Sequence, residues 1–315
     1  MKSTPLLSLI SLLLLSGCSQ NIHQKADVEP SVESFYDYQL LSPSSDVIAL
    51  TSLPDEIRNA DVVLIGEWHT HAGVHRFQTD LFKQLAQENP NLALSMEQFT
   101  RNKQDILTQY LSGEIGEQTL MKEANAWPNY ESDYRPLVEL AKFYQRDVIA
   151  SNAPKPIVKC IGQQGIGYLD KLNDTERTWL AANIDTANSA YKTKFFNSMH
   201  HGDESQTKKQ YAAQITWDAT MAESIVNYID QHPNSQVMHI AGKFHIENGL
   251  GIATQILKLN PNLNVAVVTP TEAISPESKD YQLKVLTPPK RFIKKENMMN
   301  AYKDLKNRNK DLVCK

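Results

Sequence analysis

The stretch Asp61-Val62-Val63-Leu64-Ile65-Gly66-Glu67-Trp68-His69 decides how this chain folds. Its apolar run, residues 62–65, is rich in β-branched side chains and stops at a glycine. Such a run is typical of a strand that is buried on both faces, as strands are in a parallel sheet covered by helices. The polar residues behind it stand where the strand ends. We therefore expect Glu67 and His69 at the carboxyl end of a buried parallel strand.

The sequence on either side of this stretch alternates between strand and helix patterns. Further strands are predicted at residues 91–96, 147–150, 236–240, 264–269 and 281–286, and helices at 72–87, 104–111, 117–126, 134–145, 174–184, 204–230 and 250–259. This alternation predicts an α/β fold with a mainly parallel central sheet covered by helices. A largely helical inserted lobe is expected at about residues 100–232.

The N-terminus has the pattern of an exported lipoprotein. Lys2 precedes an apolar run at residues 5–15, which is too short to span a membrane and is typical of a signal peptide. The run ends at Leu15-Ser16-Gly17-Cys18, which resembles a lipobox, the motif whose cysteine is lipidated after cleavage. An ordinary secretory signal followed by a chance cysteine is the alternative. Ser19 favours the outer membrane over the inner one, by resemblance to a known sorting rule.

These features divide the chain into four parts. We expect a signal peptide at 1–17, a lipidated N-terminus and tether at 18–44, one α/β domain at 45–289, and a polar C-terminal tail at 290–315. Acyl chains on Cys18 would hold the domain to a lipid bilayer. The net charge of −4 gives no reason to expect nucleic acid as a partner. Cys160 and Cys314 remain, and an envelope location permits a disulfide between them, but the sequence does not give their separation.

Polar and ionisable side chains follow four of the predicted strands. They include Glu67, His69, Glu97, Asn152, Lys243 and His245, with His71, His75 and His239 near them. In open α/β sheets, ligands bind beyond the carboxyl ends of the strands. Imidazole and carboxylate groups together suit a transition metal such as Zn or Mn, and they also suit general acid–base catalysis.

Each of these residues also has a structural interpretation. Glu67 and Glu97 could be strand-end carboxylates that accept hydrogen bonds from the backbone. His71 and His75 share one face of a helix start and could be surface residues, and His239 could be a core histidine with a satisfied hydrogen bond. The adjacent histidines at 200 and 201 are expected to be solvated.

A second cluster is aromatic and runs from Trp127 to Pro136, with Tyr130 and Tyr134 in it. A tyrosine phenolate can ligate the iron of haem, and aromatic neighbours suit the flat apolar face of the ring. The haem propionates prefer a cation such as Arg135. The alternative is a helix N-terminus, capped by Asp133, whose aromatic side chains pack on the core.

Five segments taken in order resemble the ChaN-like haem-binding lipoproteins, a family implicated in bacterial iron uptake. They are residues 63–69, 96–99, 127–137, 148–154 and 240–245, within a resemblance that covers about residues 45–270. The resemblance implies an α/β core with a helical lobe, and haem near a dimer interface with a tyrosine on the iron. Tyr134 matches the tyrosine before Arg-Pro in that motif, and Tyr130 is its neighbour.

The same segments resemble a wider superfamily that includes TraB, Tiki and erythromycin-esterase-like proteins, some of which are hydrolases. Glu67, His69, Glu97 and His245 occupy the matching places. This chain has Thr70 where members of the family often carry an aspartate, which weakens the hydrolase interpretation and leaves haem binding unaffected.

The resemblance therefore implies a membrane-anchored, haem-binding lipoprotein of haem or iron uptake, with no turnover. Tyr134 or Tyr130 would ligate the iron, and Arg135 and Lys243 would meet the propionates. The expected partners are haem, the bilayer, a second copy of the chain and an outer-membrane haem or iron transporter. The alternatives are a metal-dependent hydrolase that uses Glu67, His69, Glu97 and His245, and a tethered scaffold without a working site.

Overall fold

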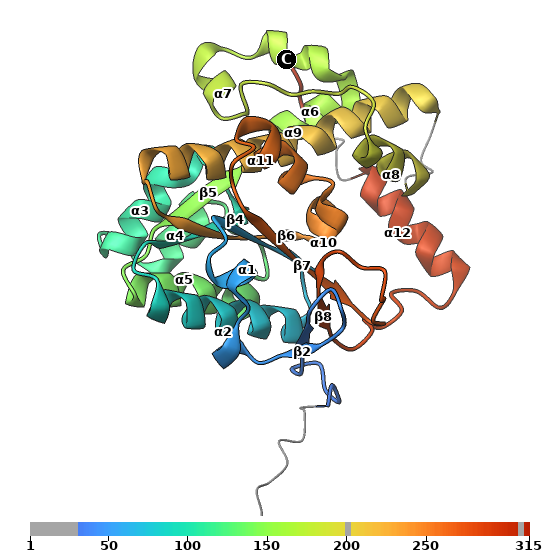
Figure 1. The fold of residues 1–315 in the computed structure, drawn as a ribbon. Helices are drawn as coiled ribbons and strands as arrows, with labels where there is room; N and C mark the ends of the chain where they lie inside the picture. The colour runs from blue at the N-terminus through green and yellow to red at the C-terminus, as the bar shows by residue number, and fades with distance from the viewer. Residues whose placement is uncertain (1–30, 199–202, 308–311) are drawn as a thin grey trace, which may run out of the picture. The chain divides into compact units, whose positions relative to one another are not determined.

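Eight strands form one sheet in the part of the chain that the computed structural model describes, residues 31–198, 203–307 and 312–315 (Figure 1). They are β1 (Gln39–Leu41), β2 (Val47–Ile48), β3 (Val62–Glu67), β4 (Leu92–Thr100), β5 (Val148–Asn152), β6 (Gln236–Gly242), β7 (Val265–Thr271) and β8 (Tyr281–Lys284). Their order in the sheet is β2-β1-β8-β7-β3-β6-β4-β5. This part of the chain, Ser31–Lys315, forms one compact unit.

The sheet is parallel from β8 to β5, and only the pairs that involve β1 are antiparallel among the described strands. β6 lies between β3 and β4, so the carboxyl ends of these three strands meet at one edge. The parallel pairing extends to Glu67, which is opposite Gly242 in the register of β3 and β6. The expected α/β fold with a mainly parallel sheet is confirmed.

Helices cover both faces of the sheet, which explains why residues 62–65 of β3 are all apolar. The described helices are α1 (Asp55–Arg58), α2 (Ala72–Glu88), α3 (Gln104–Ser112), α4 (Glu117–Glu123), α5 (Arg135–Phe143), α6 (Lys155–Gln164), α7 (Asp174–Thr178), α8 (Ala190–Ser198), α9 (Glu204–Gln231), α10 (Lys243–Ile246), α11 (Ile252–Leu259) and α12 (Lys295–Asn307). Val63 and Ile65 pack toward a core that α2, α3 and α5 complete. Val62 and Leu64 face the opposite core, which α9 and α11 complete.

The helical lobe is built around α9, the longest described helix. α6 packs along it through Val158 and Ile161, and a separate aromatic cluster joins α8 to it through Phe195 and Tyr211. Asn173 begins α7 with a capping box to Glu176. This helix ends at Thr178, where the sequence predicts that it continues to residue 184, so a non-helical segment leads from α7 to α8.

Two segments outside the predicted domain at 45–289 contain described secondary structure. β1 lies within the segment expected to be a tether, yet Leu40 is buried because β1 completes the sheet beside β8. The polar C-terminal tail contains α12, and a disulfide joins Cys314 to Cys160 of α6 with 5.6 Å between their Cα atoms. Hydrophobic burial at Leu40 and a cross-link at Cys314 therefore attach described parts of two segments whose composition is polar.

The signal peptide, Cys18 and the pair at 200–201 lie outside the described residues. Among the helices that are described, none has the length and apolar character needed to cross a membrane.

Candidate functional site

A buried carboxylate, Glu67 at the end of β3, organises the site. Its side chain is fully buried, and its Oε1 accepts hydrogen bonds from Tyr134 Oη at 2.7 Å, His69 Nδ1 at 2.8 Å and Gln98 Nε2 at 3.1 Å. Gln78 Nε2 donates to Oε2 at 2.8 Å. Burial raises the pKa of Glu67, but the hydrogen bond from His69 and the charge of His75 outweigh it, so the pKa lies below its ordinary value. Glu67 is therefore a carboxylate at neutral pH.

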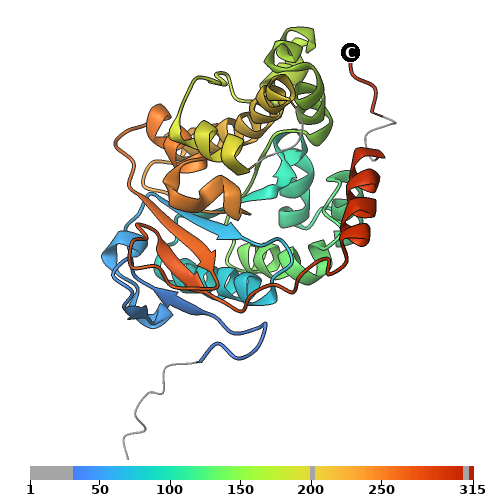
Figure 2. The same cartoon turned by 90° about the vertical axis from the view of Figure 1, so that its right-hand side faces the viewer.

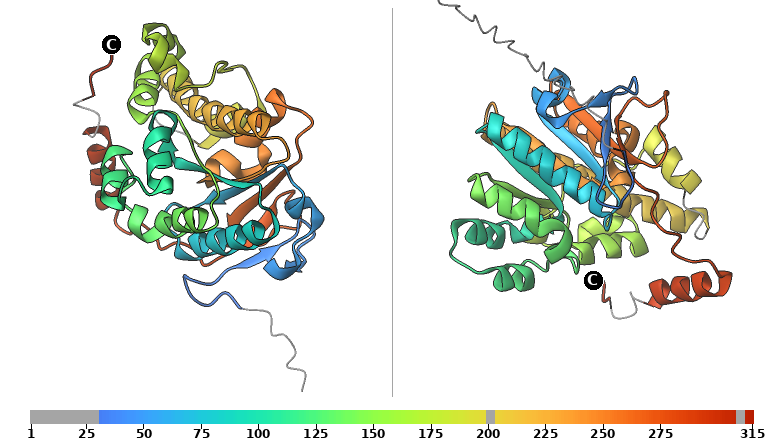
Figure 3. Two further views of the ribbon diagram at one scale, coloured as in Figure 1. Left: turned by 90° about the vertical axis from the view of Figure 1, so that its left-hand side faces the viewer. Right: turned by 90° about the horizontal axis from the view of Figure 1, so that it is seen from below.

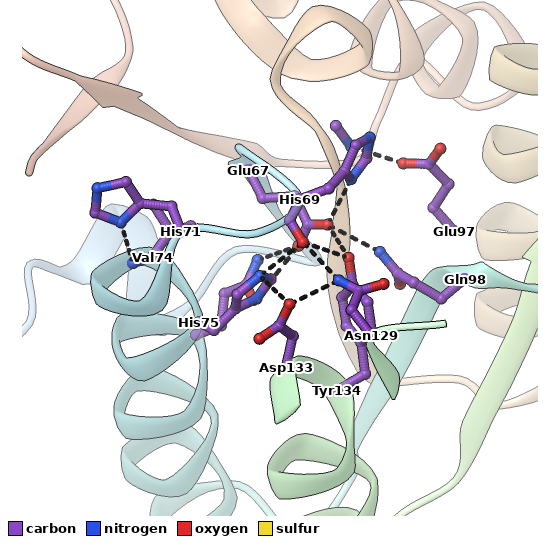
Figure 4. Close-up of polar contacts among 12 residues, drawn as sticks. Glu67, His69, His71, Val74, His75, Glu97, Gln98, Asn129, Asp133 and Tyr134 are labelled. Atoms are coloured by element: carbon purple, nitrogen blue, oxygen red, sulfur yellow. Dashed lines mark hydrogen bonds and ion pairs between the residues drawn. The ribbon is translucent and has the colours of Figure 1, made fainter. Parts of the chain in front are cut away.

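His69 is the member of this network that reaches the surface. Its side chain is 44% exposed, and Figure 4 shows it between Glu67 and Glu97. Burial lowers the pKa of His69, yet the bond to Glu67 and the charge of Glu97 raise it more. Because Nδ1 is held by Glu67, Nε2 points the other way, toward Gly242. A Cβ on Gly242 would lie 3.0 Å from that Nε2, so the glycine leaves room for the imidazole.

Glu97 supplies a second carboxylate, from an irregular part of β4. The pairing of β4 with β5 shifts register between Met96 and Thr100, and Glu97 lies inside that shift. Its Oε2 accepts a hydrogen bond from the Gly242 N–H at 2.6 Å, and its Oε1 is 3.8 Å from His245 Nε2. The strand-end residues that the sequence singles out, Glu67, His69, Glu97 and His245, are thus brought to one place.

His245 has a partner that the sequence analysis missed. Its Nδ1 is 2.5 Å from Oδ1 of Asp218, a fully buried carboxylate in the middle of α9. Burial lowers the pKa of His245, but the charges of Asp218 and Glu97 raise it to about 9. The signal that could have identified Asp218 is its place among Ile215, Ala219 and Ala222, where a helix pattern otherwise carries apolar residues.

A cleft of about 830 Å³ opens over this edge of the sheet. Its lining combines aromatic and proline side chains with polar groups, namely Phe35, Trp68, Phe244, Pro288, Pro289, Glu67, His69, His71, Gln214, Gly242, Lys243, His245, Glu247 and Arg291. Lys243 Nζ lies 5.6 Å from the centre of the Trp68 ring. Another hollow, of about 720 Å³, lies beside β5 and is lined by none of the residues in the Glu67 network.

The tyrosines of the aromatic cluster are buried. Tyr130 and Tyr134 form an irregular helical turn (Tyr130–Tyr134) before α5, and neither lines the cleft. Tyr134 donates to Glu67, and burial together with the charge of Glu67 raises its pKa far above the ordinary value. Burial also raises the pKa of Tyr130. Arg135 forms ion pairs with Glu117 and Glu131, so its charge is already compensated.

His71, His75 and His239 have structural partners. His71 begins α2, where its Nδ1 accepts from the Val74 N–H at 3.4 Å, and it points away from Glu67 in Figure 4. His75 is buried, with Nδ1 2.9 Å from Gln78 Oε1. His239 lies inside β6 with Nδ1 2.8 Å from Ser95 Oγ, and burial lowers its pKa to about 3. Within residues 31–198, 203–307 and 312–315, no group of three His, Cys, Asp or Glu side chains is arranged to hold a metal ion.

The pairing of His245 with Asp218 predicts a particular dependence of stability on pH. The folded pKa of about 9 exceeds the ordinary value of 6.5, so the stabilisation is complete below pH 6.5 and is lost as the pH rises through about 9. The free energy of unfolding should fall by about 3 kcal/mol across this window. Chemical denaturation of wild type and Asp218→Asn at several pH values measures it, and the variant should lose most of the slope. Asp230→Asn, an exposed carboxylate of the same helix, is the matched control. Parallel pH profiles of wild type and Asp218→Asn would contradict the assignment.

Comparisons with known proteins place this chain in a family. In overall fold the chain is similar to ChaN of Campylobacter jejuni, solved with cofacial haem binding, at a TM-score of 0.61 and 19% identity over 81% of this chain and 99% of that one. It is less similar to an erythromycin esterase, EreC, at a TM-score of 0.43 and 14% identity over 79% and 81% of the two chains. No curated protein matches the sequence. A family model described as haem-binding uptake, Tiki superfamily, ChaN matches residues 53–256, a span that holds the Glu67 network and most of the residues lining the cleft. The chain therefore belongs to the ChaN family of haem-binding uptake proteins in the Tiki superfamily.

Proposed function

We propose that this protein binds haem in the cleft at the carboxyl edge of the sheet and hands it on in iron or haem uptake. The residues present fit such a ligand. Phe35, Trp68 and Phe244 offer apolar ring surfaces, and Arg291 brings positive charge to the same cleft, where propionate groups would need it. Lys243 is a second cation of the lining, and its Nζ lies 3.5 Å from Glu247 Oε2. The cleft volume is within the range of small-molecule sites.

The observation that carries the proposal is the anchoring of His69. A histidine that ligates a metal commonly donates its other ring N–H to a carboxylate, which fixes the tautomer and aims the ligating nitrogen. His69 has this arrangement, because Nδ1 donates to buried Glu67 and the ring is exposed to the cleft. We therefore favour Nε2 of His69 as the group that would hold the iron. When bound, haem supplies iron for transfer, and the chain contributes positioning and charge.

Ligation by Tyr134 or Tyr130, which the family resemblance implies, remains a prediction. Either tyrosine would have to move its phenol out of a buried site. Tyr134 would also have to lose its hydrogen bond to Glu67. Burial also opposes formation of the phenolate. The two assignments of the ligand differ in their spectra, so a single titration separates them.

A haemin titration of the fragment 31–315 tests the proposal. Wild type should give a saturable Soret shift, and His69→Ala should weaken binding by about tenfold or more and alter the spectrum. Tyr134→Phe should keep the wild-type spectrum, since its hydroxyl serves Glu67. His232→Ala removes an exposed histidine that stacks on Tyr228, outside the cleft, and is the matched control.

Two results would contradict haem binding in the cleft with His69 as the iron ligand. A Soret band lost in Tyr134→Phe but kept in His69→Ala would assign the iron to tyrosine. No saturable shift in wild type would remove haem binding at this cleft. We also propose that the chain forms a homodimer when it binds haem, as the family resemblance implies. Size-exclusion chromatography of the same samples tests this, because the dimer should form as haemin is added.

We further propose that the chain is a lipoprotein held at the outer membrane by Cys18, where it would serve a haem or iron transporter. The support is the lipobox-like sequence and the family's role in uptake. Wild type and Cys18→Ser are expressed and fractionated. Wild type should be found in the membrane fraction, and the Cys18→Ser variant should be found in the soluble fraction. A variant that stays with the outer membrane to the same extent as wild type would contradict the anchor.

A second candidate function is hydrolysis, and the convergence of Glu67, His69, Glu97 and His245 favours it. His69 lies beside two carboxylates at the cleft surface, an arrangement that can accept a proton from water and return it to a leaving group. If the protein is a hydrolase, Glu97→Gln should lower the rate on a responsive ester by about a hundredfold or more while haemin binding persists. Equal rates for wild type and Glu97→Gln would exclude this role for Glu97. Elemental analysis of protein purified without chelator tests whether Zn or Mn takes part.

A further inference from the structure

The segment from Lys290 to Lys303 lies beyond the span that the family model matches, and it has an unusual surface. Phe292 and Ile293 are 44% and 82% exposed on the loop before α12. Met299 and Tyr302 on α12 are exposed as well. Several exposed bulky side chains within one short segment are typical of a contact with a partner or a membrane.

The same segment is strongly basic. It carries the cations Lys290, Arg291, Lys294, Lys295 and Lys303 against the single carboxylate Glu296, a net charge of +4 in a chain whose overall charge is −4. Two of these cations precede the Phe292-Ile293 pair directly, and two follow it. The positive charge is therefore concentrated around the most exposed apolar side chains.

Helix α12 (Lys295–Asn307) continues this pattern. Its exposed side carries Met299 and Tyr302 together with Lys295 and Lys303, while Met298 and Ala301 are partly covered. Bulky apolar residues bordered by lysines on one helix face are typical of a helix that lies in the interface of a bilayer. Figures 2 and 3 show this helix at the periphery, at the end of the long connection from β8.

We propose that residues 290–303 bind the surface of an anionic lipid bilayer, with Phe292 and Ile293 inserted among the headgroups. A protein partner, including a second copy of this chain, fits the composition less well, because lysine is depleted in the core of protein interfaces. A polybasic segment gains about 1 kcal/mol per cation near an anionic leaflet, and the inserted apolar side chains add hydrophobic burial.

This contact would set the orientation of the cleft. Pro288, Pro289 and Arg291 line the cleft and stand directly before or within the basic segment, so a bilayer bound there would lie at the rim of the cleft. The inference stands apart from the lipid on Cys18, because it concerns a second contact at the other end of the chain. It also does not depend on whether haem is the ligand.

Vesicle co-sedimentation of the fragment 31–315 tests the proposal without the N-terminal anchor, since this part of the chain forms one compact unit. The fragment should bind vesicles of phosphatidylcholine with about 30% phosphatidylglycerol, should bind pure phosphatidylcholine much more weakly, and should be released by salt. Replacing Lys290, Lys294 and Lys295, none of which lines the cleft, with glutamine should weaken binding by about fivefold per charge removed.

The apolar pair is tested by Phe292→Ser/Ile293→Ser, which should also reduce binding by tenfold or more. Leu257→Ser/Leu259→Ser is the matched control, because these two leucines are 42% and 45% exposed and flank Lys258 on α11. As a direct readout, Ile293→Trp should shift its fluorescence to the blue on anionic vesicles.

Three results would overturn the proposal. They are wild-type binding no stronger to anionic than to neutral vesicles, equal loss in the leucine control, and an unshifted fluorescence for Ile293→Trp. Sedimentation velocity is run on the same variants. If Phe292→Ser/Ile293→Ser changes a dimer into a monomer and vesicle binding is absent, the segment is an interface between copies of the chain.

Discussion

The burial of one charged carboxylate, Glu67, constrains the rest of this site. An ionised carboxylate removed from water is costly unless donors replace its hydration. Here the donors come from four separate segments, namely the loop after β3, α2, β4 and the turn before α5. Each segment must hold its donor within hydrogen-bond distance, so the positions of His69, Gln78, Gln98 and Tyr134 are coupled to one another. The charge also fixes the direction of the His69 ring, which is the exposed element of the network.

The same constraint explains which parts of the site could be predicted from the sequence. Apolar strand patterns precede Glu67, Glu97 and His245 in the sequence. Neighbouring parallel strands end at the same edge of the sheet. Their convergence therefore follows from strand type and order. The position of β6 between β3 and β4 could not be read from the sequence, because strand order depends on long-range packing.

Other features depend on contacts between residues far apart in the chain. Asp218 pairs with His245 because α9 crosses over the sheet, and a helix pattern alone does not tell which element its buried face meets. The shift of register that places Glu97 is likewise a property of two paired strands. At the C-terminus, polar composition suggests a tail, while the disulfide to α6 joins two cysteines with a sequence separation of 154, which no local pattern reveals. Tyr134 is a further example, since its sequence context fits a haem ligand and its hydrogen bond to Glu67 emerges only from the fold.

The Glu67–His69 pair is compatible with both of the chemistries considered for this fold. A carboxylate that holds Nδ1 raises the basicity of the opposite nitrogen, which strengthens a metal ligand and a general base alike. What separates the two uses is the surface in front of that nitrogen. A hydrolytic site needs a polar position for the attacking water and donors for the developing negative charge. Here the cleft that His69 lines is also lined by Phe35, Trp68 and Phe244 and by the cations Lys243 and Arg291, and Lys243 Nζ lies 5.6 Å from the centre of the Trp68 ring. Flat apolar walls with flanking cations complement a planar, dianionic ring better than they complement a tetrahedral intermediate, and for this reason haem binding is the function that the geometry supports best.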